Sequence, residues 1–350
     1  MKHRLKMGAR ELWARLLYHT GLFRLVSRLV PRRLTILTSH CVTAPSNEFL
    51  PPDMKIDGDH LGGLLRRLGR HFDWVTVGEG WRRLQAQEGR SMLALTMDDG
   101  YRDNLDALLP ILEREGATAT VYLESRPLDG QSLNWTHMYF WLLARIEHAE
   151  LVRRYAASSA DPRAVARLEE ELAKGDALTY RLKKVLKYEA DQADCERTLR
   201  DLLEAEGGDV AELCRGLYLS WEDASRLAEA GVELGGHTVH HYVLSGLDRE
   251  GQAEEVAAGK RALEERLGPM VSFAYPFGRR WDWNDDSRDA VRGAGFATAT
   301  TTHAGTNTRG SDPTRLARWM IDEHTPEHLL VCEASGGFEL LRRLGVDLSE

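Results

Sequence analysis

One short apolar segment constrains the fold of this 350-residue chain more than any other feature. Residues 91–97 (SMLALTM) are almost continuously apolar, and the turn-forming run Asp98-Asp99-Gly100 ends them. A segment of this length and character predicts a buried strand. The two aspartates then lie at the carboxyl end of that strand.

Strands and helices alternate on either side of this segment. Further strands are predicted at residues 34–39, 72–77, 117–123, 232–235, 271–275, 296–301 and 316–321. Helices are predicted at residues 59–70, 104–115, 220–230, 248–267 and 287–294. This alternation is typical of βα units, and it predicts an α/β fold with a mainly parallel sheet or barrel.

The segment from about residue 136 to 215 interrupts the alternation. It is densely charged and lacks strand-like runs, and stretches such as 165–174 and 181–187 are typical of helices. We interpret it as a helical insertion into one domain that spans residues 34–350. Such an insertion shapes access to a site, docks a partner or is a structural elaboration, and the sequence leaves these alternatives open.

The first 33 residues differ in charge from the rest of the chain. Nine Lys or Arg and one Glu give them a charge of +8, whereas the whole chain carries −8. Residues 9–30 fit a basic amphipathic helix, whose predicted apolar face holds Leu12, Leu16, Leu22, Phe23, Val26, Leu29 and Val30 opposite Arg10, Arg24 and Arg28. Such a helix either packs on its own domain or lies on an anionic membrane surface.

Charge and cysteine usage narrow the classes of function. A net charge of −8 gives no basic surface for nucleic-acid binding. The four cysteines contain no C-x-x-C pair, so neither a disulfide framework nor a thiolate zinc cluster is indicated. Arginines interrupt the N-terminal apolar stretch, which argues against a secretory signal, and we expect a cytoplasmic protein, peripheral at the inner membrane face if the basic helix binds lipid. The oligomeric state is not predicted.

The paired carboxylates Asp98 and Asp99 suggest chemistry. Adjacent carboxylates at the mouth of a buried strand repel one another, and a divalent cation relieves that repulsion by taking one as a ligand. The other then remains free as a base. The alternative is a turn with solvated aspartates, because Asp-Asp-Gly is good turn chemistry in itself.

Three histidines follow the predicted strand at residues 232–235. In a helical turn His237 and His241 project on the same side and chelate one metal ion, with His240 as the alternative to His241 on spacing. Two imidazoles and one aspartate leave coordination positions open, as hydrolytic metal sites require.

A third segment, residues 273–278 (FAYPFG), is either a core strand with a turn or a rigid loop that presents a backbone N–H to an oxyanion.

Together these motifs resemble those of the polysaccharide deacetylases, the NodB-homology or carbohydrate esterase family 4 group. Residues 96–100 (TMDDG) are similar to the family's TFDDG, residues 237–241 (HTVHH) to its H-[ST]-x-x-H, and residues 274–278 (AYPFG) to its R-x-P-[FY]-G, in the FAYPFG form of one branch. Weaker similarities to that branch lie at Ser39-His40, Leu128-Asp129-Gly130 with Trp135, residues 295–307 and residues 316–318. The resemblance runs from about residue 34 to 322.

The resemblance implies a distorted (β/α) barrel of about seven strands. It implies a metal-dependent hydrolase that removes an N-acyl group, typically N-acetyl, from an amino sugar of a glycan, glycolipid or sugar precursor, which we expect to be lipid-linked if the basic helix binds a membrane. By motif position Asp98 is the general base, and Asp99, His237 and His241 hold a divalent metal, usually Zn²⁺. The backbone N–H of Phe277 is expected to stabilise the oxyanion, and Tyr275, Trp135 and His303 to contact substrate.

Two positions depart from the family pattern. Ala274 stands where many members have an arginine that orients the base, and Arg318 is our candidate for that role. No L-x-H motif supplies the usual acid histidine near the C-terminus, so His40 is our first candidate for the general acid and His303 our second. The alternatives are a deformylase or other amide hydrolase of the same fold, or a catalytically silent glycan-binding protein.

Overall fold

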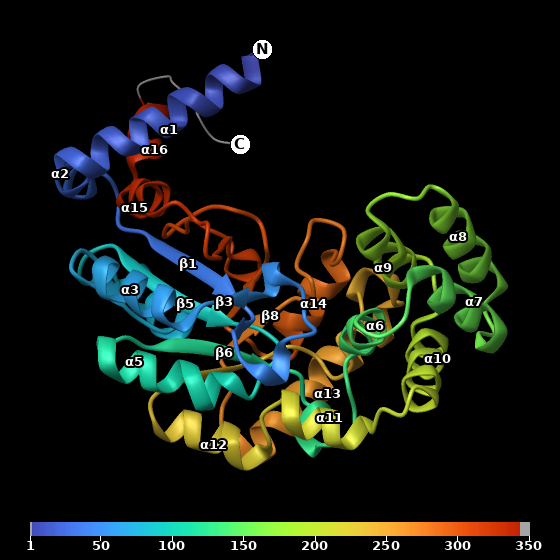
Figure 1. The fold of residues 1–350 in the computed structure, drawn as a ribbon. Coiled ribbons are helices and arrows are strands. Elements are labelled where there is room, and N and C mark those ends of the chain that lie inside the picture. Colours follow the sequence, from blue (N-terminus) through green and yellow to red (C-terminus); the bar gives the residue numbers. More distant parts are fainter. Residues whose placement is uncertain (1, 344–350) are drawn as a thin grey trace.

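The computed structural model describes residues 2–343, with side chains from residue 6 onward. Seven parallel strands form a nearly closed barrel that helices surround (Figure 1). The strands lie in the order β10-β1-β5-β6-β7-β8-β9. Their bounds are β1 Leu34–Ser39, β5 Met92–Met97, β6 Ala119–Leu123, β7 Glu233–Gly236, β8 Ser272–Ala274, β9 Thr298–Thr300 and β10 Arg318–Met320. The predicted α/β barrel is therefore confirmed.

The two ends of this strand order approach one another. Thr300 forms a parallel bridge with Leu316, two residues before β10, and Leu316 N–H donates to Ala299 O at 2.8 Å. Three short strands lie outside the ring: β4 (Asp73–Trp74) pairs with β5, and β2 (Cys41–Val42) pairs with β3 (Lys55–Ile56). The carboxyl ends of the ring strands therefore meet at one mouth of the barrel.

Helices follow the strands much as predicted. Those around the barrel are α3 Gly58–Gly69, α4 Val77–Ala86, α5 Leu109–Glu115, α12 Trp221–Glu229, α13 Arg249–Leu267 and α14 Asp285–Gly293. A π-helical stretch, Asn104–Leu108, precedes α5 without a break, so both lie within the predicted helix. The C-terminal helices are α15 Glu327–Ser335 and α16 Gly337–Arg343.

The insertion is helical throughout and lies beside the barrel (Figure 1). Its helices are α6 Trp135–Leu143, α7 His148–Ser158, α8 Pro162–Ala173, α9 Leu178–Tyr188, α10 Gln192–Ala205 and α11 Val210–Leu217. They form an apolar core of their own, distinct from that of the barrel. Tyr101, directly after β5, is buried in this second core, and Phe277, from the loop after β8, packs against it. The insertion thus joins the barrel at the mouth where the carboxyl ends of the strands meet.

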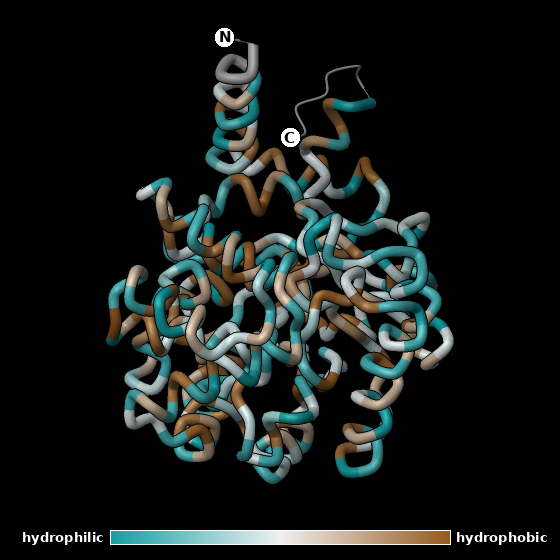
Figure 2. The backbone as a smooth tube through the Cα atoms, turned by 90° about the vertical axis from the view of Figure 1, so that its right-hand side faces the viewer, coloured by the Kyte–Doolittle hydropathy of each residue, from teal (hydrophilic) through white to brown (hydrophobic). Residues whose placement is uncertain are grey.

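The N-terminal segment is two helices, not one. α1 (Lys2–Thr20) and α2 (Phe23–Leu29) meet at Gly21, whose φ of 72° lies in the left-handed region that favours glycine. α1 extends beyond the barrel and packs on α15 (Figures 1 and 2). Because the chain bends at Gly21, a single helical wheel does not describe residues 9–30.

The predicted faces of this segment are therefore partly wrong. Phe23, Val26 and Val30 are buried, but Leu12, Leu16, Leu22 and Leu29 of the same predicted apolar face are exposed. Arg10, predicted on the polar face, is buried with its guanidinium over the rings of Trp319 and Phe338. Among residues 2–343 no helix has the length and apolar character needed to cross a membrane. The predicted regions 1–33 and 34–350 include Met1 and residues 344–350, which lie outside the described residues.

Candidate active site

Asp98, at the end of β5, is held by Arg318 from the start of β10. The two guanidinium nitrogens Nη1 and Nη2 donate to Oδ1 and Oδ2 of Asp98 at 2.7 and 2.8 Å. Nε of Arg318 donates to the carbonyl of Thr301 at 2.9 Å, and both members of the pair are buried. A bidentate pair of this kind fixes the carboxylate plane as well as its charge.

The pair also determines the protonation state of Asp98. Burial alone raises the pKa of a carboxyl group, but the positive charge and hydrogen bonds of Arg318 outweigh it, and the pKa of Asp98 lies below its ordinary value. Asp98 is therefore a carboxylate at neutral pH. The structure brings Arg318 to the carboxylate of Asp98, which we expected it to orient.

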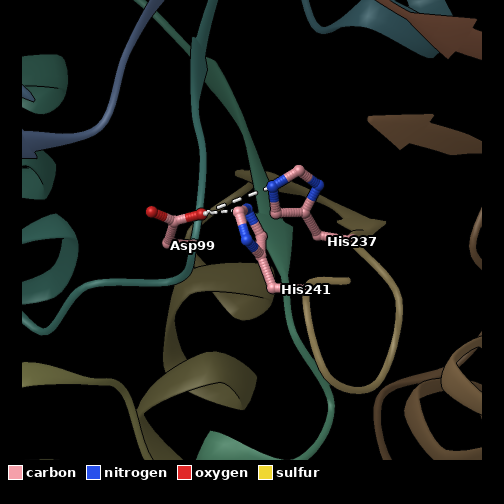
Figure 3. Close-up of side chains that lie close together, drawn as sticks. All are labelled: Asp99, His237 and His241. Carbon is pink, nitrogen blue, oxygen red and sulfur yellow. Dashed lines mark ion pairs between the residues drawn. The ribbon is translucent and has the colours of Figure 1, made fainter. Parts of the chain in front are cut away.

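Asp99, His237 and His241 face one another at the same mouth of the barrel (Figure 3). Oδ1 of Asp99 lies 3.3 Å from Nε2 of His237 and 3.5 Å from Nε2 of His241. All three side chains are buried, and their donor atoms lie within 4.8 Å of one another. One carboxylate oxygen and two imidazole nitrogens therefore point at a common centre.

This set fits a divalent metal ion. Ligand atoms about 2 Å from a tetrahedral zinc ion stand roughly 3.3 Å apart, close to the separations observed here. Within the described residues Oδ1 of Asp99 is buried without a hydrogen-bond partner, which is costly for a carboxylate unless a cation satisfies it. Nδ1 of His237 is 2.7 Å from the carbonyl of Ala274, so Nδ1 carries the proton and Nε2 is free to bind a metal.

The loop that carries the histidines is not helical, so the predicted helical turn is wrong. Thr238 and His241 adopt positive φ values of 67° and 57°, and these turns bring the two imidazoles together. The hydroxyl of Thr238 accepts from His241 N–H at 3.1 Å. His240 points elsewhere: its Nδ1 is 2.5 Å from Glu255 of α13. His241, not the alternative His240, therefore shares the site with His237.

A buried hydrogen-bond chain supports Asp99 from behind. The hydroxyl of Tyr101 donates to Oδ2 of Asp99 at 3.1 Å and contacts Nε2 of His137, whose Nδ1 contacts the hydroxyl of Tyr218. Asn134 N–H in turn donates to the Tyr218 hydroxyl at 3.2 Å. Burial lowers the pKa of His137 to about 4, so the imidazole is neutral and offers one donor and one acceptor. One arrangement of the protons satisfies every group: Tyr218 donates to His137, His137 donates to Tyr101, and Tyr101 donates to Asp99.

Phe277 occupies a strained position beside the three donors. Its φ of 60° is left-handed, and its ring packs on His241 with centroids 4.5 Å apart. The hydroxyl of Thr302 donates to its carbonyl at 3.1 Å, while its backbone N–H donates to no group within residues 2–343. The loop thus holds an unpaired N–H at the mouth of the barrel.

These groups line a cavity of about 860 Å³. Asp98, Asp99, His237, His241, Phe277 and His40 all contribute to its wall. Nδ1 of His40 is buried without a hydrogen-bond partner in the described structure, so no described group uses this ring nitrogen. The structure thereby brings His40 to the site.

The structure places three expected substrate contacts away from the cavity wall. Tyr275 is fully buried, and its hydroxyl donates to Thr314 O at 2.9 Å. Trp135 is buried behind Phe277, with ring centroids 6.2 Å apart. His303 lies against Trp283 and Thr301. Tyr275 and Trp135 are occupied by packing and His303 is exposed, and none of the three lines the described cavity.

The sequence reasoning missed residues of the insertion that reach the site. His137 stands in an apolar helical run (WTHMYFWLL), where a lone polar side chain needs a buried partner, and that signal was available. Helix α9 contributes Lys183 and Lys187 to the cavity wall. The repeated lysines of residues 181–187 are visible in the sequence, but nothing local shows that they face the carboxyl ends of the strands.

Comparisons with known proteins agree with this fold and site. The family model for polysaccharide deacetylase matches residues 186–299, which include the histidine loop and residues 274–278. YxkH of Bacillus subtilis, whose name assigns it provisionally to the polysaccharide deacetylases, is 27% identical over 105 residues. That match covers 30% of this chain and 37% of YxkH, so it spans well under half of the relative's length.

Solved structures share the fold over most of the chain. A deacetylase of Streptococcus pyogenes, PplD, in complex with acetate, has a TM-score of 0.57 at 16% identity, covering 87% of this chain and 99% of PplD. The polysaccharide deacetylase BC0361 of Bacillus cereus has a TM-score of 0.54 at 15% identity, covering 87% of this chain and 69% of BC0361. At these identities the likeness concerns the fold alone.

The fold and the site together define a distorted α/β barrel with an Asp-His-His cluster at its mouth. The matches agree with the resemblance inferred from the motifs: the chain is similar to the polysaccharide deacetylases over residues 186–299 by the family model and over 105 residues by YxkH.

Proposed function

We propose that this protein is a divalent-metal-dependent hydrolase that removes an N-acyl group, N-acetyl in the simplest case, from an amino sugar. One observation carries the proposal: a buried Asp-His-His donor set lies beside an arginine-held carboxylate at the floor of one cavity. Asp99, His237 and His241 would hold the metal, and their nitrogen and oxygen donors favour zinc. A bound zinc ion supplies a Lewis acid that polarises the acyl carbonyl and makes water more acidic.

The remaining steps fall to side chains and one backbone group. Asp98 takes a proton from a water molecule while the oxygen of that water bonds to the acyl carbon. Arg318 keeps Asp98 ionised for this step. The unpaired N–H of Phe277 donates to the oxyanion that develops. The C–N bond then breaks while His40 protonates the nitrogen, because an amide anion is a poor leaving group. The products are a carboxylate and an amine.

His40 is preferred to His303 as the acid because it alone of the two lines the cavity. Replacement of each by Gln separates them. His40→Gln is expected to lower kcat on an amide substrate far more than on an activated ester of the same sugar, whose leaving group needs no protonation. The same split in His303→Gln would reverse the assignment.

The test of the function combines metal analysis with turnover. Wild-type protein is expected to hold about one equivalent of a divalent metal and to release acetate from N-acetyl amino sugars. Asp98→Asn is expected to keep the metal and lose turnover, since it removes the base and no metal ligand. Turnover of N-formyl but not N-acetyl sugars would favour the deformylase alternative. If the metal-loaded wild type binds sugars without turnover, the result would contradict the hydrolase and favour the glycan-binding alternative.

The proposal includes contact of the N-terminal helices with an anionic membrane surface, where a lipid-linked sugar would be met. Leucines at helical spacing are exposed along both helices, namely Leu12 and Leu16 on α1, Leu22 just before α2, and Leu25 and Leu29 on α2, each with 45–71% of its surface accessible. Arg24, Arg28 and Arg32 are exposed beside the α2 row. Exposed leucines next to arginines suit the boundary between anionic headgroups and acyl chains.

Vesicle sedimentation tests this contact. The full chain is expected to sediment with vesicles containing phosphatidylglycerol and not with pure phosphatidylcholine. A Leu25→Ser/Leu29→Ser double variant is expected to remain in the supernatant. Equal recovery of both proteins with anionic vesicles would refute the contact and leave the proposed hydrolysis untouched.

A further inference from the structure

Helix α9 of the insertion forms a positively charged wall of the cavity. Five cationic side chains line the cavity, Arg181, Lys183, Lys184 and Lys187 from α9 and Arg279 from the loop after β8. Three acids line it as well, and two of these are Asp98 and Asp99 at its floor. Outside that floor the charged side chains of the wall are therefore five cations and one acid, Asp53, in a chain whose net charge is −8. Such a concentration against the overall charge focuses an anion-attracting field into the cavity.

Two of these cations already have carboxylate partners. Nζ of Lys187 is 2.9 Å from Asp282, and Nη1 of Arg181 is 3.1 Å from Glu171. Lys183, Lys184 and Arg279 form no ion pair with any residue among 6–343. Lys184 is exposed, but Lys183 is half-buried, a position in which an unpaired ammonium group is unusual.

Lys183 lies close to the reacting groups. Its Nζ is 4.6 Å from the ring centroid of Phe140 and 5.8 Å from that of Phe277, the residue whose N–H faces the oxyanion. Lys187 lies 3.8 Å from the same Phe277 ring. A ligand group bound at Lys183 and an acyl group held beside Phe277 are therefore within reach of one sugar unit.

The charge state of Lys183 reflects this setting. Burial, together with the positive charge of Lys187, lowers the pKa of Lys183 to about 8. Asp99 and Asp53 partly offset the shift, and Arg279 adds to it. Lys183 is thus still a cation at neutral pH, and an anion placed beside it would relieve both its desolvation and its repulsion from Lys187.

We propose that Lys183, Lys184 and Arg279 bind an anionic group, a phosphate or a carboxylate, carried by the amino-sugar substrate. This inference rests on the proposed function, since it names the substrate class of the same site. The cavity is large enough for more than one sugar, because small-molecule sites span roughly 300–1,000 Å³ and this one is about 860 Å³. Exposed Trp281 and Tyr180 on its lining offer faces for the sugar or its substituent.

Calorimetric binding tests the proposal without relying on turnover. The metal-loaded protein is titrated with N-acetylglucosamine 1-phosphate, with N-acetylmuramic acid and with the neutral methyl glycoside of N-acetylglucosamine. We expect at least one of the two anionic ligands to bind about tenfold or more tightly than the neutral one, as a charge-assisted hydrogen bond provides. The ligand that gains shows whether phosphate or carboxylate is recognised.

Substitutions of the cationic wall residues test whether these residues cause the preference for anionic over neutral ligands. Lys183→Met is expected to reduce the anionic-to-neutral affinity ratio toward one, and Lys183→Arg to restore part of it. Lys174→Met, at the residue that follows α8 and outside the cavity lining, is the control and should keep the ratio. Should Lys183→Met fail to fold, Lys184→Gln/Arg279→Gln provides the same measurement.

The outcomes separate this inference from the proposed function. Equal binding of all three ligands, or a ratio unchanged in both variants, overturns the inference. Acetate release from the neutral glycoside in that case would leave the hydrolase intact. Preferential, Lys183-dependent binding of an anionic sugar with no release of acetate from any ligand would support the subsite and contradict the hydrolase.

Discussion

Arg318 grips both carboxylate oxygens of Asp98 across 220 residues of chain. The motif resemblance led us to expect an arginine at the position of Ala274, whereas here the cation beside Asp98 comes from β10, on the other side of the ring order. The barrel makes this replacement possible because β10 lies next to β1, which lies next to β5. The same charge reaches the same carboxylate from a different strand.

Replacing Arg318 is expected to impair both stability and activity. Arg318→Met leaves a buried carboxylate without its partner, which costs about 3–5 kcal/mol of unfolding free energy. The pKa of Asp98 is held low by Arg318 against burial, so its removal raises that pKa. The acid limb of the kcat/KM profile should therefore move to higher pH, and kcat should fall by about 10²-fold or more.

A conservative variant separates charge from geometry. Arg318→Lys keeps the charge but loses the bidentate pairing, so we expect its acid limb to lie between those of wild type and Arg318→Met. An acid limb that does not move in either variant would mean that Asp98 is not the titrating base.

Metal binding is expected to depend on His237 and His241 but not on the neighbouring His240. His237→Ala and His241→Ala should each lose the bound metal on elemental analysis, because each removes one of three donors. His240→Ala is the control, since His240 pairs with Glu255 instead. Loss of metal from His240→Ala with retention in His241→Ala would reverse the assignment.

The hydrogen bond from Tyr101 to Asp99 predicts an effect of Tyr101 on metal affinity. Tyr101→Phe removes the hydroxyl that donates to Oδ2 of Asp99, and outer hydrogen bonds of this kind change metal affinity by about 10–100-fold. Competition with a chelator measures the change. Tyr139→Phe is the control, because its buried hydroxyl bonds to Thr179 O and not to the site. Equal metal affinities in the two variants would show that the Tyr101 side chain packs at this position but does not support metal binding.

Most of the barrel could be predicted from the sequence because its strands are short apolar runs that end in turn residues. The strand at residues 34–39 is found at the predicted bounds, and the insertion begins and ends within two residues of those expected. These features depend on local patterns of apolar and turn residues, which a single sequence displays.

Features that depend on long-range packing could not be predicted in the same way. The convergence of His237 and His241 comes from left-handed turns at Thr238 and His241, and nothing in the local sequence specifies them. Tyr275 belongs to a functional motif, yet its hydroxyl is used by Thr314 in the core. Lys183 reaches the site only because the insertion folds over the mouth of the barrel. Motif position therefore predicted which residues lie together at the mouth of the barrel better than it predicted the surroundings of each.

The pH dependence of ligand binding follows from Lys183. Its pKa is lowered from that of an ordinary lysine to about 8, so its charge is present below that pH and is lost as the pH rises through it. The preference for an anionic over a neutral sugar should therefore be constant near neutral pH and decline above about pH 8. Because a bound anion stabilises the cation, the midpoint should lie higher at saturating ligand. A preference that is flat to pH 10 would show that Lys183 does not contribute.

The close approach of α13 to the histidine loop yields a final prediction. A Cβ on Gly259 would lie 3.0 Å from the backbone of Thr238, whose left-handed turn brings His237 and His241 together. Gly259→Ala should therefore push the loop outward and weaken metal binding, although alanine favours the helix by about 1 kcal/mol. Gly293→Ala in α14, where a Cβ meets no atom within 4 Å, is the matched control. If Gly259→Ala binds metal as tightly as Gly293→Ala, the loop holds the two imidazoles together without support from α13.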